Sequence, residues 1–383
     1  MAVVSIIDLF LSACKNTPSP LQKVPAIAIK KMPVPRGRNR LPGIPACLTV
    51  VSLSLSLSLA FSLFSCQEGN KAAQTEVVQR APALDPELSE LNRRVRSEPR
   101  NPAHYHTRAR YYLRTGQYEP AMVDLRSLFS LDTSQAGYFL TAAEVYIKLG
   151  ALSQADDALG VATRKDPKLA DAHVKRGELA YLNKKYNTAM YHLNEGLKAD
   201  IHHAEGYFWK GMVHLEQGKR QPAESSFQTC IEQAPEHKEA MMQLGLMWQY
   251  DNPALAYRYY SNVVRIDSTY LEAYYARASL LQAQGYPDSA RQDYRQILAR
   301  QPAHPDALFN TGYTYLEEKR YADAIPWFDR LIAADPAHYR ALQNRGLAWE
   351  QSGQKEKALA DYRQVLKIQP GYDKAMEGIN RIQ

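Results

Sequence analysis

A repeat of 34 residues runs through most of the chain, and it constrains the fold more than any other feature. One copy, residues 305–338, carries apolar side chains at helical intervals, with Leu308 and Tyr315 on one face of its first half. Phe328 and Leu331 continue the pattern in its second half. The spacing predicts two short amphipathic helices joined by a turn. Such a pair cannot bury its apolar faces alone, so it requires further copies on either side.

Eight copies stand in register, and the fifth is one residue shorter than the others; we place them at 102–135, 136–169, 170–203, 204–237, 238–270, 271–304, 305–338 and 339–371. The eighth position is always small, namely Ala109, Ala143, Gly177, Gly211, Gly245, Ala278, Gly312 and Gly346. The twentieth is always alanine, namely Ala121, Ala155, Ala189, Ala223, Ala256, Ala290, Ala324 and Ala358. The twenty-fourth is always large and apolar, namely Leu125, Leu159, Leu193, Phe227, Tyr260, Tyr294, Phe328 and Tyr362. Small residues let the paired helices approach, and a larger side chain would overpack the crossing by about 1–3 kcal/mol.

This pattern, with a proline near the end of most copies, resembles the tetratricopeptide repeat family over residues 102–371. The resemblance implies an all-α fold, an α-solenoid that winds as a right-handed superhelix of about eight helix-turn-helix units. Residues 87–101 are then predicted to form a degenerate N-terminal capping helix. Residues 372–383 are predicted to form a C-terminal capping helix, because solenoids need a polar end.

The charge of the chain is unevenly placed. The formal net charge is +7, but residues 1–65 hold seven Lys and Arg against one acid, Asp8, so the remainder has a net charge of +1. A nearly neutral body gives no electrostatic reason to bind DNA or RNA, and we expect no nucleic-acid partner.

Residues 1–65 are predicted to be a signal peptide or signal anchor, because an apolar run at 46–65 follows Arg36, Arg38 and Arg40. The alternative is a plain transmembrane anchor over residues 46–64, which is barely long enough to span a bilayer.

The run ends in Leu63-Phe64-Ser65-Cys66, which resembles a bacterial lipobox and implies lipidation of Cys66, although Phe64 departs from the small residue usual there. If Cys66 is the mature amino terminus, we expect translation to begin at Met32, with residues 1–31 a wrongly assigned start. Residues 66–86 are predicted to be a flexible tether. Because Gln67 is not aspartate, the resemblance to bacterial lipoproteins implies a lipid anchor in the outer membrane, facing the periplasm or the outside.

The sequence holds no GxGxxG, GxxxxGK[ST], HExxH or GxSxG motif, so we expect neither an enzyme nor a cofactor. Several histidines occupy the last position of a copy and are therefore spread along the array, namely His203, His237, His304 and His338. The only close pairs, His202–His203 and His104/His106, have no cysteine or carboxylate at helical ligand spacing, and we expect no metal site.

In the family that the pattern resembles, first helices line the concave side, so positions five and nine imply the partner contacts. In the first three copies these include the charged residues Arg110, Glu144 and Glu178. In the later copies they are apolar, namely Phe208, Met212, Met242, Leu246, Tyr275, Phe309 and Tyr313. Large apolar residues on an exposed concavity mark a binding surface. The alternative is that tight curvature buries them against neighbouring first helices.

These patterns predict a non-catalytic scaffold at the bacterial cell envelope that binds a segment of a partner protein in an apolar concave groove. Two alternatives remain open. The chain could be a structural subunit of an envelope assembly or secretion complex, or a regulatory module of a separately encoded enzyme.

Overall fold

The structure is a computed structural model, and it describes residues 85–383. All regular elements in this part are α-helices, and no strand occurs among these residues. In chain order they are α2 (Pro86–Ser97), α3 (Pro102–Arg114), α4 (Tyr118–Leu131), α5 (Ala136–Lys148), α6 (Leu152–Lys165), α7 (Ala170–Leu182), α8 (Tyr186–Ala199), α9 (Ala204–Glu216), α10 (Arg220–Gln233), α11 (Lys238–Trp248), α12 (Pro253–Ile266), α13 (Leu271–Ala283), α14 (Pro287–Arg300), α15 (Pro305–Glu317), α16 (Tyr321–Ala334), α17 (Tyr339–Gln351), α18 (Lys355–Ile368) and α19 (Asp373–Ile382).

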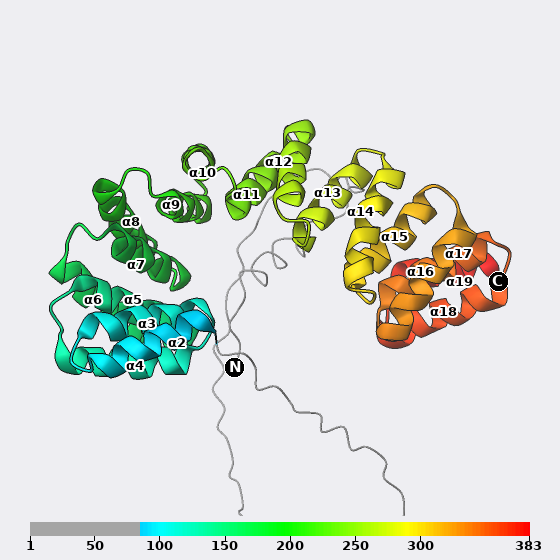
Figure 1. Ribbon diagram of the computed structural model, residues 1–383. Coiled ribbons are helices and arrows are strands. Elements are labelled where there is room, and N and C mark those ends of the chain that lie inside the picture. The colour runs from blue at the N-terminus through cyan, green and yellow to red at the C-terminus, as the bar shows by residue number, and fades with distance from the viewer. Residues whose placement is uncertain (1–84) are drawn as a thin grey trace, which may run out of the picture. The chain divides into compact units, whose positions relative to one another are not determined.

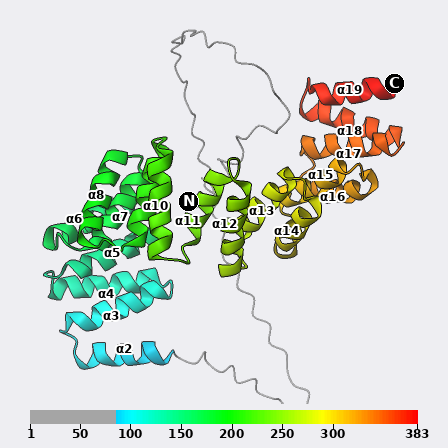
Figure 2. The ribbon, with the colours of Figure 1, turned by 90° about the horizontal axis from the view of Figure 1, so that it is seen from above.

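The helices follow one another as pairs, from α3 and α4 to α17 and α18, with α2 before them and α19 after them (Figures 1 and 2). Each helix contacts the next, and the most extensive contacts join the two helices of a pair. Some first helices also contact the following first helix, as α3 does with α5, α7 with α9 and α15 with α17. This closer approach puts the first helices on the inner side of the curve. The predicted all-α superhelical repeat fold is confirmed.

The crossing of each pair is filled as the sequence predicts. All eight alanines at position twenty and all eight large residues at position twenty-four are fully buried. Where position eight is glycine, the space is already taken, since a Cβ atom at Gly245 would lie 2.3 Å from Cε1 of Tyr260. At Gly312 it would lie 2.9 Å from Cζ of Phe328. A methyl group at these positions therefore requires an aromatic ring to move.

Histidines at the last position of a repeat cap the helix that follows. Nδ1 of His203 accepts a hydrogen bond from the backbone N–H of Gly206 at 3.2 Å. Nε2 of the same ring lies 2.9 Å from Oδ1 of Asp171 in the preceding first helix. The N-capping bond recurs, at 3.1 to 3.3 Å, at His237, His304 and His338. Each cap satisfies a backbone donor at a helix end that has no partner within the helix.

A second set of polar contacts joins the helices of three repeats through arginine side chains. Position seven of a first helix is arginine, and its guanidinium forms two hydrogen bonds with an aspartate 16 residues later, on the second helix of the same pair. The pairs, with both distances between 2.6 and 2.9 Å, are Arg108–Asp124, Arg277–Asp293 and Arg345–Asp361. Each arginine also bonds a residue 16 positions earlier, namely Asn92, Ser261 and Asp329. The clamp thus joins three consecutive helices.

Several predictions about the amino-terminal part concern residues that the structure does not describe. The signal segment at 1–65, the lipidated Cys66 and nearly all of the tether at 66–86 lie outside the described residues. Within residues 85–383, no helix is long and apolar enough to cross a membrane.

Candidate partner-binding surface

The inner row of helices carries a set of half-buried apolar side chains. We call the side of α9, α11, α13 and α15 that holds positions five and nine the first-helix face. Five of the predicted contacts are half-buried on this face, namely Met212, Leu246, Tyr275, Phe309 and Tyr313. They retain surface that a partner can cover, and Met212, Tyr275, Phe309 and Tyr313 also pack on the core.

Phe309 and Tyr313, both on α15, form a stacked pair whose ring centroids lie 6.1 Å apart with an interplanar angle of 8°. The edge of Phe309 meets the fully buried Phe328, with centroids 5.9 Å apart. Its other neighbour is the capping ring of His338, at 5.7 Å. Burial, with a smaller contribution from Glu317, raises the pKa of Tyr313. The two rings are therefore held firmly by the core below them and lose little side-chain entropy on binding.

Tyr275 on α13 connects neighbouring repeats across the same face. Nδ2 of Asn310 on α15 donates a hydrogen bond to the Tyr275 hydroxyl at 3.1 Å. The Tyr275 ring lies 6.3 Å from the capping ring of His304 and 6.2 Å from the buried Tyr294. Its position is thus fixed by contacts in both repeats, and it packs on the same core cluster as Phe309.

The structure places two of the predicted contacts in the core. Phe208 is 4% exposed and Met242 is 2% exposed. The ring of Phe208 lies 5.9 Å from that of Phe227 and 4.9 Å from that of His237. The capping histidine lies closer to Phe208 than the corresponding His338 lies to Phe309, with ring centroids 4.9 and 5.7 Å apart. Phe208 and Met242 offer almost no surface to a partner, as the burial alternative anticipated.

The charged residues of the first three repeats are arranged differently. Arg110 is exposed on α3. Oε1 of Glu144 lies 3.5 Å from Nζ of Lys175 in the next first helix. Glu178 is half-buried, and burial raises the pKa of its carboxyl group. This end of the face is polar and holds both signs of charge, so it suits orientation of a partner more than tight apolar contact.

The described part of the chain holds neither a metal-binding cluster of side chains nor a reactive thiol. No group of three or more His, Cys, Asp or Glu that could hold a metal ion occurs between residues 85 and 383. Cys230 is fully buried in α10, and burial raises its pKa to about 12. Its thiol therefore stays protonated and behaves as a small core residue.

Family descriptions of the tetratricopeptide repeat match residues 204–237, 275–339 and 312–381. A family described as anaphase-promoting complex, cyclosome, subunit 3 matches residues 90–162. One curated relative, BBSome complex member BBS4 of Bos taurus, is 27% identical over 205 residues. That match covers 52% of this chain and 35% of the relative, so the chain spans about a third of that protein's length.

Solved structures with a similar fold include bacterial proteins. MamA is 23% identical, with a TM-score of 0.41 over 45% of this chain and 94% of its own. The pilF protein of Pseudomonas aeruginosa is 14% identical, with a TM-score of 0.46 over 56% of this chain and 98% of its own. A tetratricopeptide repeat protein of Parabacteroides merdae is 17% identical, with a TM-score of 0.43 over 64% of this chain and 98% of its own.

Proposed function

Because this chain is a tetratricopeptide repeat protein, and such proteins bind protein partners, we propose that it is a non-catalytic scaffold that holds a partner segment against its first-helix face. The observation that carries this proposal is the set of three aromatic rings, Tyr275, Phe309 and Tyr313, that pack on one core cluster from first helices. These three rings are half-buried and fixed from below, a combination typical of the anchoring residues of protein interfaces.

The occupant that fits this surface is an extended or helical segment with apolar side chains. Half-buried aromatic, methionine and leucine side chains bind such segments by burying more apolar area, at about 25 cal/mol per Å². Met212 and Leu246 extend the apolar strip towards the middle of the array. The charges of the first repeats, Arg110, Glu144 and Glu178, then set the direction in which the segment lies.

The test compares alanine substitutions of two tyrosines, one on the first-helix face and one in an exposed turn. Tyr313→Ala removes half of the stacked pair, whereas Tyr286→Ala removes a side chain that is 61% exposed in the turn before α14. We expect Tyr313→Ala to lose the partner in a crosslinking pulldown from the native membrane fraction, with unchanged far-UV circular dichroism. Tyr286→Ala should capture the partner as the wild type does. Capture by Tyr313→Ala at the wild-type level would count against this face as the binding site.

We extend the proposal to the place where the scaffold works. The basic and apolar segment before Cys66, and its resemblance to a lipobox, support lipid attachment at the bacterial cell envelope, with the outer membrane favoured because Gln67 follows. A single acyl chain anchors only marginally, so stable attachment needs several chains. Leu11-Ser12-Ala13-Cys14 also resembles a lipobox, but no Lys or Arg precedes it. Metabolic labelling with palmitate should therefore survive Cys14→Ser and disappear with Cys66→Ser. Labelling that follows Cys14 instead would refute this assignment.

A further inference from the structure

Five first helices in the described part of the chain carry a cation at position seven, and four of these cations pair with a carboxylate, Arg176 of the third repeat doing so with Asp156 at 3.1 Å. The cation of the fourth repeat is the exception. In three repeats the cation at position seven finds an aspartate 16 residues later and a polar partner 16 residues earlier, as Arg277 does with Asp293 and Ser261. Both side chains of that carboxylate pair are largely buried, with 16% and 8% exposed. The clamp therefore satisfies a buried cation from within the chain.

In the fourth repeat position seven is Lys210, and no carboxylate completes the clamp. The residue 16 positions later is Ser226, whose hydroxyl already donates to the carbonyl of Pro222 at 2.7 Å. The residue 16 positions earlier is Asn194, a neutral amide. No ion pair or hydrogen bond joins Lys210 to another residue in the part of the chain that the structure describes. Lys210 is a half-buried residue and lacks the carboxylate partner that its counterparts have.

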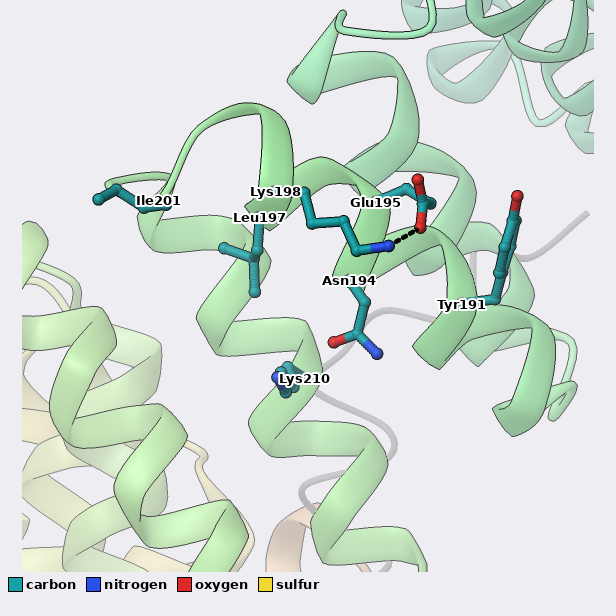
Figure 3. Close-up of a pocket in the computed structure, with 7 residues that line it drawn as sticks. All are labelled: Tyr191, Asn194, Glu195, Leu197, Lys198, Ile201 and Lys210. Atoms are coloured by element: carbon teal, nitrogen blue, oxygen red, sulfur yellow. Dashed lines mark hydrogen bonds and ion pairs between the residues drawn. The ribbon is translucent and has the colours of Figure 1, made fainter.

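A pocket lies beside Lys210. Its volume is about 630 Å³, and α8, the turn after it and α9 supply its lining: Tyr191, Asn194, Glu195, Leu197, Lys198, Ile201 and Lys210 (Figure 3). The only carboxylate of this lining, Glu195, is already paired with Lys198 at 2.5 Å. Figure 3 shows Asn194 reaching from α8 towards α9, which carries Lys210. The lining therefore has one uncompensated positive charge beside an amide.

The rest of the lining is apolar and unusually open. Tyr191 is 60% exposed and Ile201 is 61% exposed, and both are among the most exposed large apolar side chains of residues 85–383. Leu197 forms the base between them at 8% exposed. Exposed apolar side chains around a polar group mark an interaction site, because covering them removes apolar surface from water.

We propose that this pocket is a second docking site, on α8 and α9 rather than on the first-helix face, and that it takes an acidic segment of a partner protein. A glutamate or aspartate of that segment pairs with Lys210 and supplies the carboxylate that Asp124, Asp293 and Asp361 supply within other repeats. An apolar residue beside it packs on Leu197 and Ile201.

The charge of the pocket favours a carboxylate over a phosphate. A phosphate dianion is usually held by clustered arginines or by several backbone N–H groups at a helix end. Here one unpaired ammonium and one amide face an apolar wall, which matches a single negative charge on an otherwise apolar segment. The proposal does not depend on the first-helix face, so either site can fail alone.

The test uses the full chain and a pair of labelled peptides, Gly-Ser-Leu-Glu-Leu-Ser-Gly and the same peptide with Gln in place of Glu. Fluorescence anisotropy should show the Glu peptide binding the wild type at least roughly tenfold more tightly than the Gln peptide, as expected of a charged hydrogen bond. Lys210→Met should abolish this preference, and Lys210→Arg should keep it. Lys219→Met, at an exposed lysine before α10, should behave as the wild type.

An internal competitor gives a second, independent variant. Ser226→Asp places a carboxylate 16 residues after Lys210, as in the three arginine clamps, so it should close the clamp on Lys210 and weaken binding of the Glu peptide about as much as Lys210→Met does. Equal binding of both peptides to the wild type, or wild-type binding by Lys210→Met, would overturn the proposal. Displacement of the peptide by inorganic phosphate at an equal concentration would overturn the assignment to a peptide carboxylate. Self-association that Lys210→Met abolishes would make the occupant a second copy of this chain and would equally overturn it.

Discussion

Replacing Gly245 by alanine is expected to destabilise the array by about 2 kcal/mol, against the usual preference of helices for alanine. Alanine is favoured over glycine inside a helix by about 1 kcal/mol. However, the added Cβ atom would lie 2.3 Å from Cε1 of Tyr260 and 2.8 Å from its Cδ1, so the ring must move by about 1 Å to reach van der Waals contact. Overpacking of a close-packed core costs about 1–3 kcal/mol. This is the shortest such contact among the glycines, so we take a cost of about 3 kcal/mol, and subtracting the helix preference for alanine leaves a net loss of about 2 kcal/mol.

Urea unfolding followed by circular dichroism measures this effect, with Gly137→Ala as the matched control. Gly137 also lies in a helix, and a Cβ atom there meets nothing within 4 Å, so its replacement should be neutral or slightly stabilising. The double variant Gly245→Ala with Tyr260→Leu recreates the Ala–Leu pair of the first two repeats and should relieve the clash. A Gly245→Ala protein as stable as Gly137→Ala would refute the packing argument, as would a double variant that shows no coupling.

Three further predictions concern single contacts. His338→Ala should lower the free energy of unfolding by about 1 kcal/mol, because it removes the acceptor for the Ala341 N–H. His338→Asn should restore most of this loss. An Asn variant no more stable than the Ala variant would contradict the capping role. Lys319 has a φ of 59°, so Lys319→Gly should raise the melting temperature slightly, by relieving up to about 1 kcal/mol of strain, and a lower melting temperature would contradict this. Burial lowers the pKa of His192 to about 4, so the unfolded state binds more protons between pH 6.5 and 4 and stability falls by roughly 3 kcal/mol across that window. His192→Leu should flatten this part of the profile, and an unchanged slope would show that other groups cause it.

The repeat architecture could be predicted because its signal is local and recurs eight times. A small residue, an alanine and a large apolar residue at fixed spacing define how two helices cross, and Gly312, Ala324 and Phe328 are buried together as that spacing requires. The first helix of each pair begins at the first residue of its repeat as the period places it.

The binding surface could be predicted only in outline. Helical phase gives the direction of a side chain but not how closely the surrounding rings cover it. Phe208 is buried among Trp209, Phe227 and His237, whereas Phe309 is half-exposed. The capping role of the histidines could have been predicted, because each one stands immediately before a first helix. From the sequence we placed them only at the last position of a repeat. The arginine clamps also have a signal in the sequence, because arginine and aspartate stand 16 residues apart in each of them. A net charge summed over the whole chain does not reveal this spacing.

The central claim is that partner binding takes place on the first-helix face, and site-specific photo-crosslinking tests it most directly. A photoreactive phenylalanine derivative placed at Tyr313, and separately at Tyr286 as a control, is irradiated in cells that express the full chain. The account predicts a discrete crosslinked protein from position 313 and none of the same size from position 286. The same adduct from both positions, or an adduct from position 286 alone, would contradict it.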